Sequence, residues 1–359
     1  MKRFLTVFLL FVLVIENVSA LPFVKIKNGN KYGLINKQFK LVTETDYTDI
    51  TFINSYVFLN SRNNIEIRNE KNQIVDKVNS DECGFFTSVN YLIDDYYVFH
   101  GFSKDLIYNV KSKASFYSKK IAANKFNEKT SYLQPVYTEG YYFSISDQNK
   151  YFSNSRYQKA YPFVDGVAIV LKDNWQKALI DENGNLIVDD IINCGWQFKN
   201  GLLPVITKEY SGFINLKGEL VYKCPIVDEY KNENVGANPT LSCSFSDGYA
   251  YVHTKKDKWM LINKKFEIIK NDLPYFVNTR GDFSEEMLPV YLDSKCGYLN
   301  TKGELCIPLI FDEAEDFYNG YACVIYKGEN GIVDKKGNLY LVKDILNGKK
   351  EIHMNVCIK

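Results

Sequence analysis

The stretch Phe317-Tyr-Asn-Gly-Tyr-Ala-Cys-Val324 contains the motif that decides the fold. Phe317 opens a polar turn that ends in Gly320, and Val324 follows in a short apolar run. We call such a four-residue turn segment a rung. Five rungs occur, each with a Val seven residues after its Phe: Phe163-Val-Asp-Gly166, Phe198-Lys-Asn-Gly201, Phe245-Ser-Asp-Gly248, Phe283-Ser-Glu-Glu286 and Phe317-Tyr-Asn-Gly320. Recurrence at a period of tens of residues indicates a repeat architecture.

A second hairpin signal follows each rung. An apolar strand runs into Asn or Asp, then two further residues, then usually Gly. Asn or Asp at the start of a turn binds its own backbone two residues on, and Gly supplies the positive φ of a three-residue hairpin loop with a bulge. The five copies are Lys177–Gly184, Ser211–Gly218, Trp259–Phe266, Cys296–Gly303 and Asn330–Gly337.

The ends of these turns lie at positions 184, 218, 266, 303 and 337, so the steps are 34, 48, 37 and 34 residues. The long step is explained by an insertion near Glu229–Thr240, whose composition predicts an exposed loop.

The hairpin pattern also occurs upstream of these five copies. Tyr32–Phe39 matches the same template, while Ile65–Asn72, Tyr141–Asn149 and the stretch around Tyr108 are degenerate copies.

These features predict an all-β protein, because Tyr, Phe, Ile and Val fill short strand-like runs and few stretches show a helical period. We expect a tandem array of about nine stacked antiparallel β-hairpins in an open, curved solenoid, since neighbouring units cover each other's apolar faces. A closed β-propeller is the alternative. The expected division is 1–20 signal peptide, 21–155 degenerate repeats, 156–345 clear repeats and 346–359 C-terminal tail.

The unit Cys296-Gly-Tyr-Leu-Asn-Thr-Lys-Gly303 continues with Ile307-Pro308, Phe311-Asp312 and the rung Phe317–Gly320. This order resembles the WG-repeat family, also described as KWG or β-hairpin repeats, with Cys296 in place of the family's Trp. The resemblance is closest over 160–340 and weaker over 21–155. It implies a bacterial-type repeat scaffold and carries over no general enzymatic activity, cofactor or fixed ligand.

Residues 1–20 have the three parts of a secretory signal. Lys2 and Arg3 give the positive region, Phe4–Ile15 is apolar apart from one Thr, and Val18-Ser-Ala20 offers a cleavage site. An uncleaved anchor is the alternative, but the apolar run is shorter than the ~20 residues that a bilayer needs. We therefore expect an exported protein (periplasm, cell surface or extracellular) with no transmembrane segment after cleavage.

The net charge, the lack of a glycosylation sequon and the cysteines give three further indications, about partners, source and disulfides. Removal of Lys2, Arg3 and Glu16 changes the formal charge from +1 to 0, which gives no reason to expect nucleic acid or an anionic membrane as partner. No Asn-x-Ser/Thr sequon follows residue 20, which favours a bacterial source. Among the eight Cys, Cys296 and Cys306 lie on the two arms of one hairpin and are the candidate disulfide, unless both are small core residues.

The sequence offers no catalytic, cofactor-binding or metal-ligating residues. His100, His253 and His353 are isolated, and no nucleophile, zinc or phosphate-binding motif occurs. The recurring carboxylates, such as Asp165 and Asp247, are better explained as turn caps than as a glycosidase pair, which would occur once. No enzyme activity and no cofactor are therefore expected.

Aromatic residues leave two interpretations open. Nine Tyr are candidates for a sugar-stacking surface or for packing between hairpins: Tyr141, Tyr142, Tyr151, Tyr157, Tyr161, Tyr249, Tyr251, Tyr318 and Tyr321. Trp175 and Trp196 lie outside the family's Trp position, and we expect them to pack in the core. The predicted function is an exported, non-enzymatic scaffold for protein–protein interaction; the alternative is a carbohydrate-binding or structural envelope protein.

Overall fold

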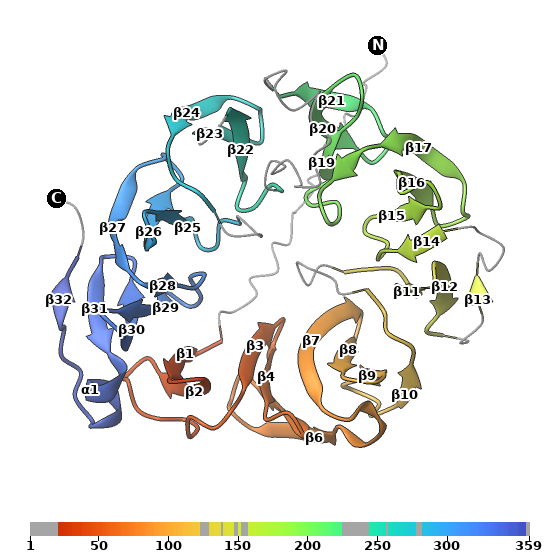
Figure 1. The fold of residues 1–359 in the computed structure, drawn as a ribbon. Helices are drawn as coiled ribbons and strands as arrows, with labels where there is room; N and C mark the ends of the chain where they lie inside the picture. Colours follow the sequence, from red (N-terminus) through yellow and green to blue (C-terminus); the bar gives the residue numbers. More distant parts are fainter. Residues whose placement is uncertain are drawn as a thin grey trace, which may run out of the picture.

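The computed structural model describes residues 21–122, 129–137, 139–146, 150–151, 157–224, 244–255, 258–277 and 282–356. These residues form a ring of small antiparallel sheets around a central axis, with the first strand of each sheet toward the centre and the last toward the rim (Figure 1). The chain passes from sheet to sheet in sequence order, and β1 and β2 lie beside the last sheet. The molecule is therefore a closed β-propeller.

Nine sheets are present in the described part of the chain, each hydrogen-bonded in strand order. The first four contain β1 (Phe23–Asn28) and β2 (Lys31–Asn36); β3 (Asp49–Ile53), β4 (Tyr56–Asn60), β5 (Asn64–Asn69) and β6 (Ile74–Asn79); β7 (Phe86–Ile93), β8 (Tyr96–Gly101), β9 (Asp105–Asn109) and β10 (Ser115–Ser118); β11 (Leu133–Val136), β12 (Tyr141–Ser144) and β13 (Lys150–Tyr151).

The rungs lie in the other five sheets. These contain β14 (Tyr157–Ala160), β15 (Val167–Lys172), β16 (Lys177–Asp181) and β17 (Leu186–Ile191); β18 (Asn193–Cys194), β19 (Leu202–Ile206), β20 (Ser211–Asn215) and β21 (Leu220–Lys223); β22 (Tyr249–Lys255), β23 (Lys258–Asn263) and β24 (Ile268–Leu273); β25 (Met287–Leu292), β26 (Lys295–Asn300) and β27 (Leu305–Phe311); β28 (Glu313–Ala314), β29 (Tyr321–Tyr326), β30 (Glu329–Asp334), β31 (Asn338–Leu341) and β32 (Met354–Asn355).

Helical structure is confined, in the described residues, to the 3-10 turn η1 (Asp81–Cys83) and the single-turn helix α1 (Val342–Leu346). The prediction of an all-β protein is thus confirmed. None of the described helices has the length and apolar character needed to cross a membrane.

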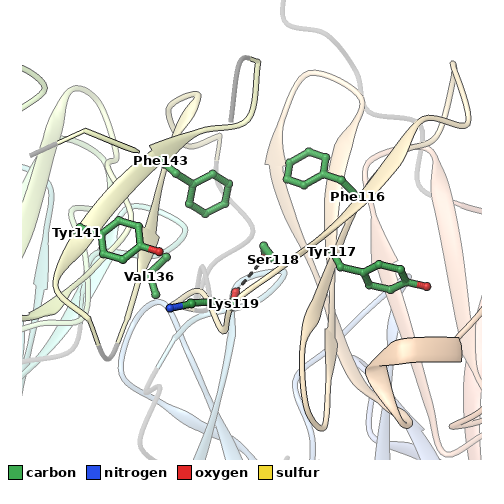
Figure 2. Close-up of a pocket in the computed structure, with 7 residues that line it drawn as sticks. All are labelled: Phe116, Tyr117, Ser118, Lys119, Val136, Tyr141 and Phe143. Atoms are coloured by element: carbon green, nitrogen blue, oxygen red, sulfur yellow. Dashed lines mark hydrogen bonds between the residues drawn. The ribbon is translucent and has the colours of Figure 1, made fainter. Parts of the chain in front are cut away.

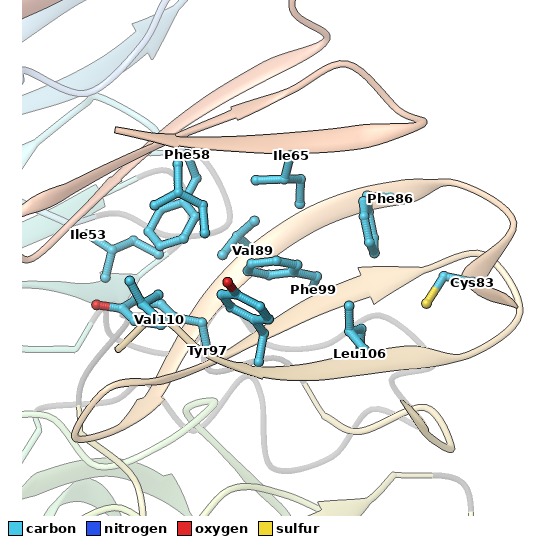
Figure 3. Packing of buried hydrophobic residues seen from close by; sticks show 12 residues of the cluster. Ile53, Phe58, Ile65, Cys83, Phe86, Val89, Tyr97, Phe99, Leu106 and Val110 are labelled. Carbon is cyan, nitrogen blue, oxygen red and sulfur yellow. The ribbon is translucent and has the colours of Figure 1, made fainter. Parts of the chain in front are cut away.

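The core consists of apolar clusters between neighbouring sheets. Figure 3 shows one of them, in which Phe58 and Ile65 of the second sheet pack against Phe86, Phe99 and neighbouring residues of the third. An equivalent cluster joins the first sheet to the last, where Val24 and Ile26 contact Ile332 and Tyr340. The prediction of an open solenoid is therefore wrong: the two end sheets cover each other's apolar faces, and the ring closes.

Each rung is a tight turn that directly precedes the strand containing its Val, namely β15, β19, β22, β25 or β29. The third and fourth residues of the rungs both have positive φ, for example Asp247 (47°) with Gly248 (88°) and Asn319 (53°) with Gly320 (85°). This is the backbone of a type I′ hairpin turn, which explains the recurrent Asp/Asn-Gly pairs. The Val seven residues after each rung Phe is buried in all five sheets.

Side chains of four of the rungs also connect their sheet to the next one or, at the closure, to the first. Asn200 Nδ2 donates to Phe245 O (3.1 Å), Asp247 Oδ2 accepts from Glu286 N (2.8 Å), and Glu285 Oε2 accepts from Gly320 N (2.9 Å). At the closure, Asn319 Nδ2 donates to the carbonyl oxygens of Leu21 and Phe23, both at 2.6 Å. The rung carboxylates and amides are therefore structural groups that link consecutive sheets.

One rung departs from the pattern and gives a stability prediction. Glu286 has φ of 67° where the other four rungs have Gly, a conformation that costs a side-chain-bearing residue about 1 kcal/mol. Glu286→Gly keeps the backbone N–H bond to Asp247, so we expect the free energy of unfolding to rise by about 1 kcal/mol in urea denaturation. Gly248→Ala is the matched control and should lower it by a similar amount; equal stability of both variants would contradict this account.

The second hairpin signals form as predicted. Asp181 Oδ1 accepts from the backbone N–H groups of Asn183 and Asn185, and Gly184 has φ of 82°. Residues 1–20 and the insertion at 229–240 lie outside the described residues. The C-terminal tail contains β32, which pairs with β31.

The candidate Cys296–Cys306 disulfide is not formed, and both residues are free thiols. Breaks in the register place Cys296 opposite Phe311, and Cys306 Sγ lies 3.3 Å from Tyr298 O. The six described cysteines are free thiols: Cys83, Cys194, Cys224, Cys296, Cys306 and Cys323. Cys296, with 1% of its surface exposed, behaves as the small core residue of the alternative interpretation.

Candidate functional site

A cleft of about 150 Å³ opens between the third and fourth sheets (Figure 2), beside the outermost strand β10 at the rim of the ring (Figure 1). Strand β10 and the residue after it form one wall, and β11 and β12 form the other. We call this site the β10 cleft, and its lining residues are Phe116, Tyr117, Ser118, Lys119, Val136, Tyr141 and Phe143.

Two aromatic rings face each other across the β10 cleft. Phe116 and Phe143 are in an edge-to-face arrangement with ring centroids 6.4 Å apart, and Figure 2 shows Tyr141 and Val136 below them. Lys119 lies at the mouth, where its Nζ is 2.6 Å from Glu139 Oε1. The site therefore combines an apolar interior with a charged margin.

The size and chemistry of the β10 cleft limit what it can do. Pockets for drug-sized ligands typically measure ~300–1,000 Å³, about two or more times this volume. The lining residues include no carboxylate, thiol or imidazole that would act as acid, base or nucleophile. The cleft is suited to one or two apolar side chains of a larger partner.

Strand β10 itself has an open edge. It is the outermost strand of its sheet, and it pairs with β9 in unbroken register from Ser115↔Tyr108 to Ser118↔Asp105. Five other outermost strands, by contrast, meet their neighbour with a break in register: β6, β17, β21, β24 and β27. Bulges of this kind protect sheet edges from pairing with other chains, and β10 lacks one.

A buried polar network supports this wall of the cleft. The carboxylate of Asp105, at 0% exposure, accepts from Ile121 N (2.9 Å) and Gly101 N (3.3 Å) and lies 2.8 Å from Lys120 Nζ and 3.0 Å from His100 Nδ1. Burial disfavours its ionised form, but the hydrogen bonds and charges of His100 and Lys120 outweigh this and lower the pKa of Asp105. The network joins the residues that follow β10 to the β8–β9 hairpin.

The three histidines occupy unrelated places. His100 belongs to the Asp105 network, His253 lies against Trp259, and His353 lies near Tyr326. Nowhere in the described ranges are three or more His, Cys, Asp or Glu side chains grouped so that they could hold a metal ion. The candidate carboxylates Asp165 and Asp247 lie in the rungs of different sheets.

The tyrosines that the sequence offered as a sugar-stacking surface lie mainly within the packing between sheets. Tyr142 and Tyr251 are fully buried, and the other described members are partly buried, with Tyr151 outside the described side chains. The expectation for the two tryptophans is wrong: Trp175 is 70% exposed and Trp196 51% exposed. Trp175 lies in the β15–β16 turn, whose tip projects beyond the core.

Sequence reasoning missed the β10 cleft. A signal exists in Lys111-Ser-Lys-Ala-Ser-Phe-Tyr-Ser-Lys-Lys120, a short aromatic strand with two lysines on each side and no acidic residue. Lysines next to a strand are typical of an exposed sheet edge. The second wall, from β11 and β12, adjoins this segment only through folding, for example at the bridge between Ile121 and Val136.

Structural comparison supports the fold. The crystal structure of the eukaryotic initiation factor is similar with a TM-score of 0.54 and 7% identity, covering 86% of this chain and 91% of that one. BamB from Moraxella catarrhalis (TM-score 0.38, 9% identity, 79% and 92% covered) and Kluyveromyces lactis Hsv2p (TM-score 0.38, 10% identity, 82% and 96% covered) are more distant. At these identities the likeness concerns the fold alone.

Sequence comparison identifies the repeat. None of the curated proteins compared with the chain matches it. The family of the WG containing repeat matches at three separate places, residues 32–58, 145–174 and 297–329. The third of these contains the Gly297–Gly303 hairpin and the Phe317–Gly320 rung, which carry the resemblance in the sequence. The chain therefore contains WG repeats at these three places.

Proposed function

We propose that this protein is a non-enzymatic propeller scaffold that binds a protein partner at the β10 cleft. The observation that carries the proposal is the combination, at one site, of an aromatic cleft too small for a typical small-molecule ligand and an outer strand edge without a bulge. Aromatic residues beside a rigid apolar pocket are the usual centre of a protein interface. Fold alone does not define a function, so the argument rests on this site.

Two further features belong to the proposal. The WG repeats and the ring architecture fit a repeat scaffold for interactions. Export remains part of the proposal because residues 1–20 have the pattern of a secretory signal. A carbohydrate ligand is the second candidate, favoured by the exposed rings of Trp175 and Trp196.

Site-specific photo-cross-linking in the producing cell tests the function. With p-benzoylphenylalanine in place of Tyr117, we expect a discrete protein adduct, because Tyr117 is exposed beside the cleft. The matched control carries the same group in place of Ile74, which is also exposed on an outermost strand but lies on the second sheet. Mass spectrometry of the adducts identifies what was bound.

The outcomes separate the candidate functions. A protein adduct several-fold stronger at Tyr117 than at Ile74 supports a protein partner at this site. Equal labelling at both positions, or none at either, would exclude the β10 cleft as the interface. Quenching of Trp fluorescence by polysaccharides, lost in a Trp175→Ala/Trp196→Ala variant, would instead support the carbohydrate alternative.

A further inference from the structure

We propose that β10 binds an extended segment of a protein partner as an additional antiparallel strand, and that this segment has apolar residues at alternate positions and acidic residues at its ends. The inference rests on the proposed function and names the site and the chemistry of the partner. Strand addition at an exposed edge is a general mode of peptide recognition, in which the backbone gives affinity and side-chain pockets give specificity.

The backbone of β10 presents unpaired groups at the rim. Asn109 N donates to Ala114 O at 2.9 Å, so residues 109 and 114 are a hydrogen-bonded pair of the β9–β10 hairpin. Such pairs alternate along an antiparallel ladder, and the N–H and C=O groups of Ser115 and Tyr117 therefore point away from β9. The bond from Val110 N to Asp95 O follows the same alternation on the other side of β9. No described residue pairs with the outer edge of Ser115–Ser118.

The chain itself contains an example of strand addition. In the last sheet, β31 also pairs with its inner neighbour in unbroken register, and β32 covers its outer edge. His353 N donates to Leu339 O and Val356 N to Gly337 O, both at 2.8 Å. Met354 and Val356, two residues apart, contact the apolar cluster beneath. A regular outer strand of this propeller thus accepts a short extended segment with alternating apolar residues.

The β10 cleft provides space for the side chains of such a segment. In an antiparallel pair, the residue directly opposite Phe116 lies on the same face of the sheet as Phe116. That face looks into the cleft toward Phe143 and Tyr141 (Figure 2). One apolar side chain of the added strand would therefore pack beside the Phe116–Phe143 ring pair, and its neighbours two positions away would flank it.

Charge favours an acidic segment over a second copy of this chain. Residues 111–120 contain four Lys and no acidic residue. Two copies of β10 paired antiparallel about Phe116 would bring Lys111 and Lys113 of one copy toward Lys119 and Lys120 of the other, and like charges opposite each other destabilise a sheet. Lys120 is held by the buried Asp105. The other three lysines pair with acids at the surface, as Lys119 does with Glu139, and such exposed pairs exchange partners at little cost.

Selection from a random ten-residue peptide library tests the proposal. Peptides enriched on the purified full chain should carry apolar residues at alternate positions and acidic residues toward their ends. Binding of the fluorescein-labelled synthetic form of the best peptide is measured by anisotropy. Tyr117→Pro removes an outward N–H and should weaken binding about tenfold or more, the loss expected for one or two backbone hydrogen bonds.

Two matched variants isolate the backbone effect. Tyr117→Thr keeps the N–H and a strand-forming residue, so its affinity should stay within about threefold of wild type. Lys223→Pro makes the same substitution in β21, another outermost strand. Cys224 N donates to Ser211 O, so the backbone N–H of the preceding residue, Lys223, points away from β20. This variant should bind the peptide as wild type does. Circular dichroism of the variants confirms that they fold, and amide exchange at Ser115 and Tyr117 should slow in the complex.

The contrary outcomes are distinct. No enrichment, or enriched peptides that bind Tyr117→Pro as well as wild type, would refute strand addition, while a protein adduct at position 117 would leave the proposed scaffold function intact. A dimer of the chain in light scattering that Tyr117→Pro dissolves would show that the edge pairs with a second copy and would overturn the choice of partner.

Discussion

Replacing Glu315 by alanine is expected to lower the free energy of unfolding by about 2–3 kcal/mol and to loosen the ring where its two ends meet. Removal of one member of a buried ion pair costs ~3–5 kcal/mol because it leaves the other charge without a partner. The pair here is partly exposed, which reduces the cost. Urea denaturation gives the stability, and amide exchange in β1 and β2 reports the loosening.

The geometry at the closure explains this effect. Lys25 Nζ of β1 is 2.7 Å from Glu315 Oε2 of the last sheet, and Tyr32 Oη donates to Glu315 Oε1 at 3.1 Å. Burial of Lys25 favours its neutral form, but the charge and hydrogen bond of Glu315, together with smaller effects of Cys323 and Asp49, outweigh this and raise the pKa of Lys25. Glu315 thus holds both strands of the first sheet against the end of the chain.

A second ion pair at the same closure is the control. Lys27 Nζ lies 3.0 Å from Glu313 Oε2, but the Glu313 side chain is 62% exposed. Exposed pairs contribute ~0–1 kcal/mol, so Glu313→Ala should lower the stability by less than 1 kcal/mol. Equal effects of the two substitutions would show that burial of the Lys25–Glu315 pair does not matter for closure.

The Lys25–Glu315 pair also predicts how the free energy of unfolding changes in alkaline solution. Because the pKa of Lys25 is raised in the folded state, its contribution is complete below the ~10.4 of an unfolded lysine and is lost as pH rises through the folded value. The stability difference between wild type and Glu315→Ala should therefore shrink in strongly alkaline solution and remain constant between pH 6 and 9, at about 2–3 kcal/mol.

Local features of the fold could be predicted from the sequence, whereas the closure could not. The turn at Asp181–Gly184 follows from its own residues, because Asp binds the backbone two residues on and Gly adopts positive φ. The positive φ of Asn319 and Gly320 likewise follows from residue type. The bonds from Asn319 to Leu21 and Phe23 join residues almost 300 positions apart, and no local pattern specifies them. An open and a closed array of the same hairpins have the same periodicity.

The candidate site was harder to predict than the fold, because its signal departs from the repeat. Phe116 and Tyr117 occur in a unit with a degenerate turn, and the opposite wall comes from a different sheet. The exposure of Trp175 depends on a turn tip that lies beyond the core. The residues that recur in every repeat are those that form the scaffold. A binding site specific to this chain lies where one repeat differs from the others, so the recurring pattern does not reveal it.

Replacing Asp105 by asparagine is expected to have the largest effect, a loss of about 3–5 kcal/mol in the free energy of unfolding. The two carboxylate oxygens accept from Ile121 N and Gly101 N and face Lys120 and His100. An asparagine retains one acceptor oxygen and turns an N–H₂ group toward these donors, in a position with no exposed surface. Because Asp105 lies opposite Ser118, amide exchange in β10 should accelerate together with the loss of stability.

The control and the pH dependence test whether the buried charge is the cause. Glu82→Gln removes an exposed pair with Lys104 beside the same hairpin and should change the stability far less than Asp105→Asn does. Since the pKa of Asp105 is lowered, its contribution is present above the ~3.9 of an unfolded aspartate and is lost as pH falls through the folded value. The difference between wild type and Asp105→Asn should therefore narrow as the pH falls toward 2. If the stability difference between wild type and Asp105→Asn stayed the same in acid, the lost stability would come from altered packing. The charge of Asp105 would then not be what stabilises β10.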